Sequence, residues 1–198
     1  ARRQRQMCIR DRLQGKQRVL LVTDKNIAAI PAVQTLIEQV RGKVSSLHIV
    51  DSVPPEPSQH DVATLLAALE SRDVDLTIGV GGGSVLDVAK LLSVLCVAGA
   101  PTLDALLAGE KPQQRTPSLL IPTTAGTGSE ATPNAILAIP EKETKVGIIS
   151  PVMLPDYVVL APELTTSMPA HIASSTGIDA LCHLCLLYTS DAADERSS

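Results

Sequence analysis

The chain has 198 residues, a net charge of −4, 44% apolar residues and 19% charged residues. This composition is typical of a globular protein, and the negative charge argues against nucleic acid as a partner. No apolar run approaches the roughly 20 residues of a membrane span, and no signal peptide is evident, so we expect a cytoplasmic protein without a membrane partner. The four scattered cysteines indicate reduced thiols.

The two ends of the chain differ in character from the part between them. Residues 1–12 show neither helical nor strand periodicity, and residues 185–198 interrupt a helical pattern. Both resemble translated sequencing-adapter sequence, so we expect residues 13–184 to be the genuine protein and its natural chain to continue past both ends. The alternative is an ordinary flexible tail at each terminus.

The predicted elements alternate between strands and helices. Short apolar runs predict strands at 18–23, 44–50, 75–80, 118–121 and 157–160. Helical patterns with capping or stop residues predict helices at 30–40, 58–71 and 84–97 and another after Pro162. Two runs at 135–139 and 145–149 predict a hairpin. This alternation predicts an α/β fold with a Rossmann-like, doubly wound, mostly parallel sheet that binds ligands at the carboxyl ends of its strands.

Three glycines, Gly81 to Gly83, separate the strand at 75–80 from the helix at 84–97. Ser84 is expected to cap that helix with Asp87 as its partner, and the helix is apolar nearly all round, which predicts burial on both sides. Glycines allow backbone N–H groups to approach a phosphate at the positive end of a helix, so the turn indicates a diphosphate site. The spacing fits neither a Walker A loop nor a strict GxGxxG pattern, and a turn that merely packs tightly is the alternative.

Two further polar stretches follow predicted strands. Asp24 comes after the first strand, and the hydroxyl- and glycine-rich loop at 122–130 (PTTAGTGSE) comes after the fourth. Because carboxyl ends of parallel strands meet at one edge of a sheet, we expect both stretches to join the glycine turn in a nucleotide site. An Ω-like surface loop is the alternative for 122–130.

Asp179 and His183 stand four residues apart, so they project from one face of the last predicted helix. A carboxylate and an imidazole so placed can share a divalent metal, although a solvated helix pair is the more common reason for this spacing. Cys182 and Cys185 also fit a CxxC reading, which we discount because Cys185 begins the anomalous tail.

Taken together, GGGSVLDVAK, PTTAGTGSE, KVGIISPVMLPDYVVLAPELTTSMP and STGIDALCH resemble, in order and spacing, the iron-containing (group III) alcohol dehydrogenases. The resemblance covers about residues 13–183. It implies a dinucleotide-binding α/β domain at 13–160 and the truncated start of a helical, metal-binding domain at 161–184.

The resemblance assigns a role to each candidate site residue. It places the pyrophosphate of NAD on Gly81, Gly82, Gly83 and Ser84, and further cofactor contacts on Thr123, Thr124 and Thr127. Asp24 would meet the adenosine ribose, where a carboxylate favours NAD over NADP, and Lys145 would lie near a ribose. Asp179 and His183 would be the first two ligands of a divalent metal, usually iron(II) and sometimes zinc.

The implied activity is NAD-dependent, metal-assisted hydride transfer between an alcohol and an aldehyde in an enzyme that forms homo-oligomers. The family's two remaining metal ligands are histidines with no match here, since His48, His60 and His171 are expected to be surface or loop residues. We therefore expect this fragment to bind cofactor but not to turn over. A polyol dehydrogenase or dehydroquinate-synthase-like enzyme of the same fold is one alternative, and a non-catalytic nucleotide-binding module is another.

Overall fold

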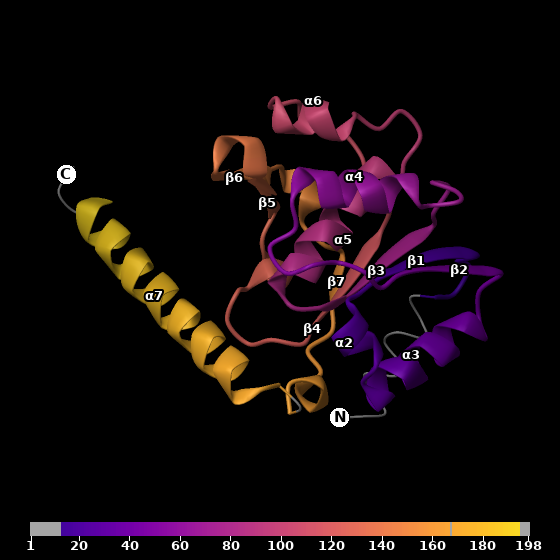
Figure 1. The fold of residues 1–198 in the computed structure, drawn as a ribbon, viewed down its shortest axis with the longest axis horizontal. Helices are drawn as coiled ribbons and strands as arrows, with labels where there is room; N and C mark the ends of the chain where they lie inside the picture. Colours follow the sequence, from indigo (N-terminus) through magenta and orange to yellow (C-terminus); the bar gives the residue numbers. More distant parts are fainter. Residues whose placement is uncertain (1–12, 167, 195–198) are drawn as a thin grey trace.

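A five-stranded parallel sheet forms the centre of the protein (Figure 1). The computed structural model describes residues 13–166 and 168–194. The strands follow the order β2-β1-β3-β4-β7, and every neighbouring pair is parallel. Their bounds are β1 (Arg18–Val22), β2 (Ser46–Val50), β3 (Leu76–Gly81), β4 (Ser118–Pro122) and β7 (Tyr157–Val158). The predicted doubly wound α/β fold is thereby confirmed.

Helices cover both faces of this sheet, which explains why its central strands are apolar throughout. β3 and β4 are buried at every position. On one face, α3 (Pro31–Arg41) packs Val33, Ile37 and Val40 in a cluster with alternate residues of β1. On the other face, α4 (Gln59–Ala67) and α5 (Gly83–Leu95) pack against the remaining residues of β1. Apolar burial on both sides is the expected state of a parallel sheet.

The most buried helix is α5, and it lies between the sheet and a separate hairpin. All residues from Val85 to Leu95 are buried. The hairpin pairs β5 (Asn134–Ile139) with β6 (Thr144–Ile149) in antiparallel register, as predicted. Its inward residues Ala135, Leu137 and Ile148 join the same apolar cluster as α5. The helix thus has an apolar neighbour on each side, as its composition predicts.

Several helix boundaries differ from the sequence-based expectations. Ser58 caps α4 in a capping box with Asp61, as expected, but the helix ends at Ala67 instead of near residue 71. The expectation that Ser84 caps α5 is wrong, because the helix begins at Gly83 with Gly82 as its N-cap. Two short helices were not predicted: α2 (Lys25–Ala28) and α6 (Leu103–Leu107). Their N-cap residues, Asp24 and Thr102, are equally common in loops. Neither helix is long enough to show the 3.6-residue periodicity of apolar positions.

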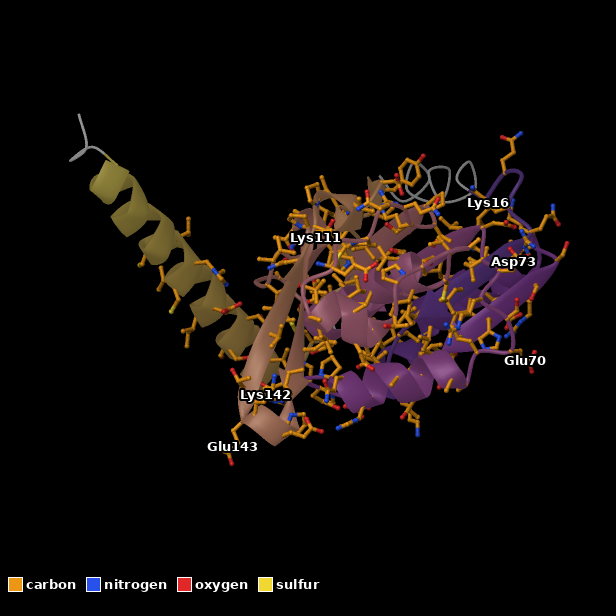
Figure 2. The ribbon with its side chains drawn as sticks, turned by 90° about the horizontal axis from the view of Figure 1, so that it is seen from above. Lys16, Glu70, Asp73, Lys111, Lys142 and Glu143 are labelled. Atoms are coloured by element: carbon orange, nitrogen blue, oxygen red, sulfur yellow. The ribbon has the colours of Figure 1, made fainter. Side chains whose placement is uncertain are left out.

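Short 3₁₀ turns separate the elements that follow β4, and the last of them precedes a long helix. The turns are η1 (Ser129–Ala131), η2 (Pro140–Lys142), η3 (Pro151–Met153) and η4 (Pro162–Leu164). Helix α7 (Ala170–Asp194) extends away from the α/β layers (Figure 1). Figure 2 shows the hairpin turn, with Lys142 and Glu143, on the opposite side of the α/β layers from Lys16 and Asp73. No helix within the described residues is long and apolar enough to cross a membrane.

The anomalous termini have different outcomes. The backbone of α7 continues through residues 185–194, so the change in composition at Cys185 does not coincide with a helix end. Residues 1–12 and 195–198 lie outside the described residues. The domain boundaries at 160 and 184 stay predictions.

Candidate functional site

A cleft of about 940 Å³ opens at the carboxyl ends of the strands. From β1 the chain crosses to β2 on one side, then returns through α4 to β3 on the other side. The loops that follow β1 and β3 therefore diverge, and open α/β sheets bind ligands at such a switch point. Residues that follow four strands line the cleft, among them Asp24 after β1, Gly82 after β3 and Thr123 after β4. The predicted convergence of these stretches is confirmed.

The glycine turn leaves the first turn of α5 open toward the cleft. Gly82 is the N-cap residue, and no side chain of the described residues caps the helix. A Cβ atom at Gly81 would stand 2.6 Å from Cβ of Val85, so this glycine is required for packing. A Cβ atom at Gly82 would stand 3.3 Å from Cγ2 of Thr124, and both residues line the cleft. The N–H groups at this helix start can approach an anion that a side chain would exclude.

The loop at 122–130 packs directly against the glycine turn. The N–H of Thr123 donates to the carbonyl of Gly81 over 2.9 Å. A Cβ atom at Gly83 would stand 3.0 Å from Cγ2 of Thr127 and 3.2 Å from Oγ of Ser129. Thr123 is 2% exposed, and its Oγ1 has no hydrogen-bond partner among the described residues. Because buried hydroxyls normally find a partner, this orphaned group at the cleft wall fits a polar ligand.

Two carboxylates lie at the mouth of the cleft. Oδ1 of Asp24 accepts from the N–H groups of Asn26 and Ile27 over 2.9 and 3.0 Å, so Asp24 also caps α2. Asp51, which directly follows β2, lines the same cleft. Sequence reasoning missed Asp51, although the rule that located Asp24 at a strand end applies to it equally.

Glu56, in the loop before α4, contacts both Lys145 and Ser84. Nζ of Lys145 lies 2.9 Å from Oε1 of Glu56, and the N–H of Glu56 donates to Oγ of Ser84 over 3.3 Å. Ser84 lines the cleft together with Pro54 and Pro55 of that loop. Lys145 is not among the described residues that line the cleft. It is connected to the lining residue Ser84 through Glu56. Gly81, Gly83 and Thr127 likewise support the lining from behind.

Asp179 and His183 are brought together on α7, but no further ligand from the described part of the chain joins them. Oδ1 of Asp179 lies 3.6 Å from Nε2 of His183, and both side chains are exposed. Within residues 13–166 and 168–194, no three or more His, Cys, Asp or Glu side chains gather as a metal site would require. As a carboxylate–imidazole pair on one helix face, they fit two positions of a metal's ligand set and do not complete it.

The start of α7 reaches the cleft and brings His171 into its lining. His171 and Ile172 line the cleft from the first turn of the helix. His171 is exposed, as expected for a surface residue, but its place in the cleft lining was not predicted. The seven residues from Ile172 to Asp179 correspond to about 10 Å of helix. Asp179 and His183 thus stand about two and three helical turns beyond Ile172 on the same element.

Comparison with known proteins agrees with this geometry. A family model described as "Iron-containing alcohol dehydrogenase" matches residues 7–162. Long-chain-alcohol dehydrogenase 1 of Geobacillus thermodenitrificans is 37% identical over 186 residues, which cover 92% of this chain and 47% of that protein. The chain spans about half the length of the curated relatives it matches.

Solved structures give the same result. An iron-containing alcohol dehydrogenase from Thermotoga maritima superposes with a TM-score of 0.76 at 36% identity, covering 84% of this chain and 46% of that one. Sulfoacetaldehyde reductase from Bifidobacterium kashiwanohense, solved in complex with NAD⁺, superposes with a TM-score of 0.75 at 30% identity. That match covers 85% of this chain and 44% of the reductase.

Proposed function

The chain belongs to the iron-containing alcohol dehydrogenase family, and we propose that its cleft binds NAD for a metal-assisted alcohol dehydrogenase. The observation that carries this proposal is the open start of α5 at the switch point, where Gly82 faces the cleft beside the orphaned hydroxyl of Thr123. A solved relative that holds NAD⁺ supports the choice of cofactor. The alternative that the glycine turn only packs tightly accounts for Gly81, but it gives no role to the open helix start.

The pyrophosphate would lie against the turn from Gly81 to Ser84. Its negative charge would meet the N–H groups and the partial positive charge at the start of α5. Thr123 and Thr124, which also line the cleft, would donate to the pyrophosphate through their hydroxyls, with Thr127 behind them. In this arrangement the chain binds and orients the dinucleotide, and the nicotinamide supplies the hydride chemistry when it is bound.

The charge at the mouth of the cleft supports NAD over NADP. Asp24 and Asp51 both line the cleft, and a carboxylate accepts a hydrogen bond from a ribose 2′-hydroxyl but repels a 2′-phosphate. Lys145 would turn from Glu56 toward a ribose hydroxyl when the cofactor is bound, since only a surface ion pair holds it.

The metal would be held by Asp179 and His183 together with ligands from other parts of the whole enzyme. Iron(II) is favoured and zinc is the alternative, and when bound the metal supplies Lewis-acid polarisation of the substrate oxygen. Asp179 and His183 would serve only as ligands. No side chain of this site then needs to act as a strong base toward the substrate.

The substrate is proposed as a small alcohol or aldehyde without further definition. The two relatives named above differ in this respect, one being called a long-chain-alcohol dehydrogenase and the other a sulfoacetaldehyde reductase. A net charge of −4 supports a small-molecule partner over nucleic acid. Homo-oligomeric assembly stays a prediction from the family resemblance, and a cytoplasmic location stays a prediction from the sequence.

A chimera tests the metal-dependent function against the nucleotide-binding module. Residues 13–184 would be continued with the remaining part of the Geobacillus relative, and alcohol oxidation and bound iron would be measured. We expect Asp179→Ala and His183→Ala to abolish both while NADH affinity is unchanged, and His60→Ala, an exposed histidine on α4, to change nothing. The chain without that continuation should bind iron or zinc weakly and oxidise no alcohol. Full activity and metal content in the Asp179→Ala and His183→Ala chimeras would contradict the proposal.

A further inference from the structure

Lys90 is the largest fully buried side chain of the protein's described part, and nothing above assigns it a role. It lies on α5, seven residues after Gly83, with 0% of its side chain exposed. Burial lowers the pKa of Lys90, and the carboxylate of Asp87 opposes that shift. Nζ of Lys90 lies 2.9 Å from Oδ1 of Asp87, one turn earlier on the helix. Burying an ammonium group is costly, so its partners indicate what the burial achieves.

The ammonium group of Lys90 donates to the end of the loop at 122–130 and to the segment that follows it. Its acceptors are the carbonyl oxygens of Ser129 at 2.9 Å and Thr132 at 3.3 Å, and the carbonyl of Asn134 at the start of β5. The hydroxyl of Thr132 at 3.4 Å and Oδ1 of Asp87 at 2.9 Å also lie near Nζ, so five acceptors share the three N–H donors of the lysine. A single side chain of α5 thus gathers three backbone groups of residues 129–134.

Asp87 adds a contact two residues further along β5, at Ile136. Its Oδ2 accepts from the N–H of Ile136 over 3.1 Å, while its Oδ1 faces Lys90. The two side chains together hold residues 129–136 against α5. Because α5 also begins at the glycine turn, the same helix carries the open helix start in the cleft and holds the segment that follows the loop at 122–130.

The packing at Ser129 connects this buried pair to the cleft. Ser129 lies near the end of the loop at 122–130 and is itself buried. Its carbonyl accepts a hydrogen bond from Lys90. Its Oγ and Cγ2 of Thr127 bound the space at Gly83. Movement of Ser129 would therefore release the loop that presents Thr123 and Thr124 to the cleft.

We propose that Lys90 and Asp87 are positioning residues of the cofactor cleft, which hold the loop at 123–129 in register with the glycine turn without touching the dinucleotide. This inference rests on the proposed cofactor function. It gives a reason for Asp87 and Lys90 of GGGSVLDVAK beyond forming a helix.

The rival explanation is that the pair only stabilises the core. Replacing a buried ion pair by apolar residues of similar volume is often neutral for stability. The backbone carbonyls of residues 129–134, however, accept from no described side chain of α5 other than Lys90. A positioning role therefore predicts a local effect on the loop and on cofactor affinity. A purely structural role predicts a global effect on unfolding.

The test compares Lys90→Met with Lys90→Arg, which keeps donors, and with Lys142→Met, an exposed control on the hairpin turn labelled in Figure 2. NADH affinity is measured by titration calorimetry and local opening by amide hydrogen exchange. We expect Lys90→Met to weaken NADH binding by about tenfold or more and to raise exchange in residues 123–136 but not in β1 and β3. Lys90→Arg should recover part of both, and Lys142→Met should match the parent chain.

Further outcomes keep the inference separate from the cofactor assignment. If the parent chain binds no NADH, the proposed function fails, while the exchange measurement still decides whether Lys90 holds the loop. Asp87→Asn, which keeps the size of the side chain, provides the same test should Lys90→Met not fold. Unchanged NADH affinity in the folded variants, or faster exchange spread evenly over the sheet, would overturn the proposal.

Discussion

Asp24 has two roles at the residue scale, one structural and one electrostatic. Its Oδ1 caps α2, and its charge lies in the cleft beside that of Asp51. Asparagine caps helices about as well as aspartate, so Asp24→Asn removes the charge and keeps the cap. This substitution therefore separates the two roles.

We predict that Asp24→Asn raises the affinity for NADPH relative to NADH by about tenfold. One unit charge near a phosphate contributes on the order of 1 kcal/mol or more, and 1.4 kcal/mol is a factor of ten. Titration calorimetry with both nucleotides measures the ratio. Adding Asp51→Asn should move the ratio further in the same direction. A ratio unchanged in both variants would mean that Asp24 only caps α2.

The sequence predicts which residues line the cleft better than it predicts which residues these contact. Asp24, Gly82, Ser84, Thr123 and Thr124 line it as expected, because each follows a predicted strand at the carboxyl edge. The structure shows a different partner for Ser84, which accepts from Glu56, a residue 28 positions away. Such a partner depends on tertiary packing, so a local capping rule cannot anticipate it.

At the element scale, β1 is joined to β3 by an ion pair at the point where the two strands begin. The guanidinium NH2 of Arg18 lies 2.7 Å from Oδ1 of Asp75, whose Oδ2 accepts from the N–H groups of Gln17 and Arg18 over 3.0 and 2.9 Å. The hydrogen bond from Arg18 is the largest cause that lowers the pKa of Asp75, from 3.8 to about 2. The side chain of Asp75 is 23% exposed, so solvent weakens the pair only in part.

We predict that Asp75→Asn lowers the free energy of unfolding by about 1 kcal/mol at pH 7, since each pKa unit corresponds to about 1.4 kcal/mol and solvent screens Arg18, whose side chain is 46% exposed. The folded pKa lies below the unfolded one, so this stabilisation is present above pH 3.8 and is lost as the pH falls toward 2. Urea unfolding at several pH values measures the difference. The nearby, more exposed Asp73→Asn should cost less, and a cost for Asp75→Asn that does not change with pH would contradict the assignment.

Elements with long apolar runs or clear turn signals could be predicted from the sequence. The five strands of the sheet, the hairpin, α3, α4 and α5 all belong to this class. The helices α2 and α6 could not, because four- and five-residue helices show no period and depend on a local cap. The pairing of Arg18 with Asp75 joins residues 57 positions apart, and nothing local indicates it.

At the scale of the whole molecule, the strand order creates the site. The order β2-β1-β3-β4-β7 places the ends of β1 and β3 side by side, where the connecting loops separate. The alternation of strands and helices predicts a parallel sheet but not which strands become neighbours. The position of His171 in the cleft depends on how α7 leaves the sheet, so the sequence alone could not reveal it.

The central claim is that the open helix start at Gly82 holds the pyrophosphate of a dinucleotide. A valine at this position would place its side chain in the cleft beside Thr124, where only moderate crowding opposes it. Gly147→Val is the matched control, because Gly147 lies on β6 and a Cβ atom added there would meet no atom of the described residues within 4 Å. Both variants should retain the far-ultraviolet circular dichroism of the parent chain.

The most direct measurement is calorimetric titration of NADH into the parent chain, Gly82→Val and Gly147→Val under one set of conditions. The account predicts saturable one-to-one binding by the parent chain and by Gly147→Val, and a loss of about tenfold or more in affinity for Gly82→Val. Equal affinity in all three proteins, or no binding by the folded parent chain, would contradict it.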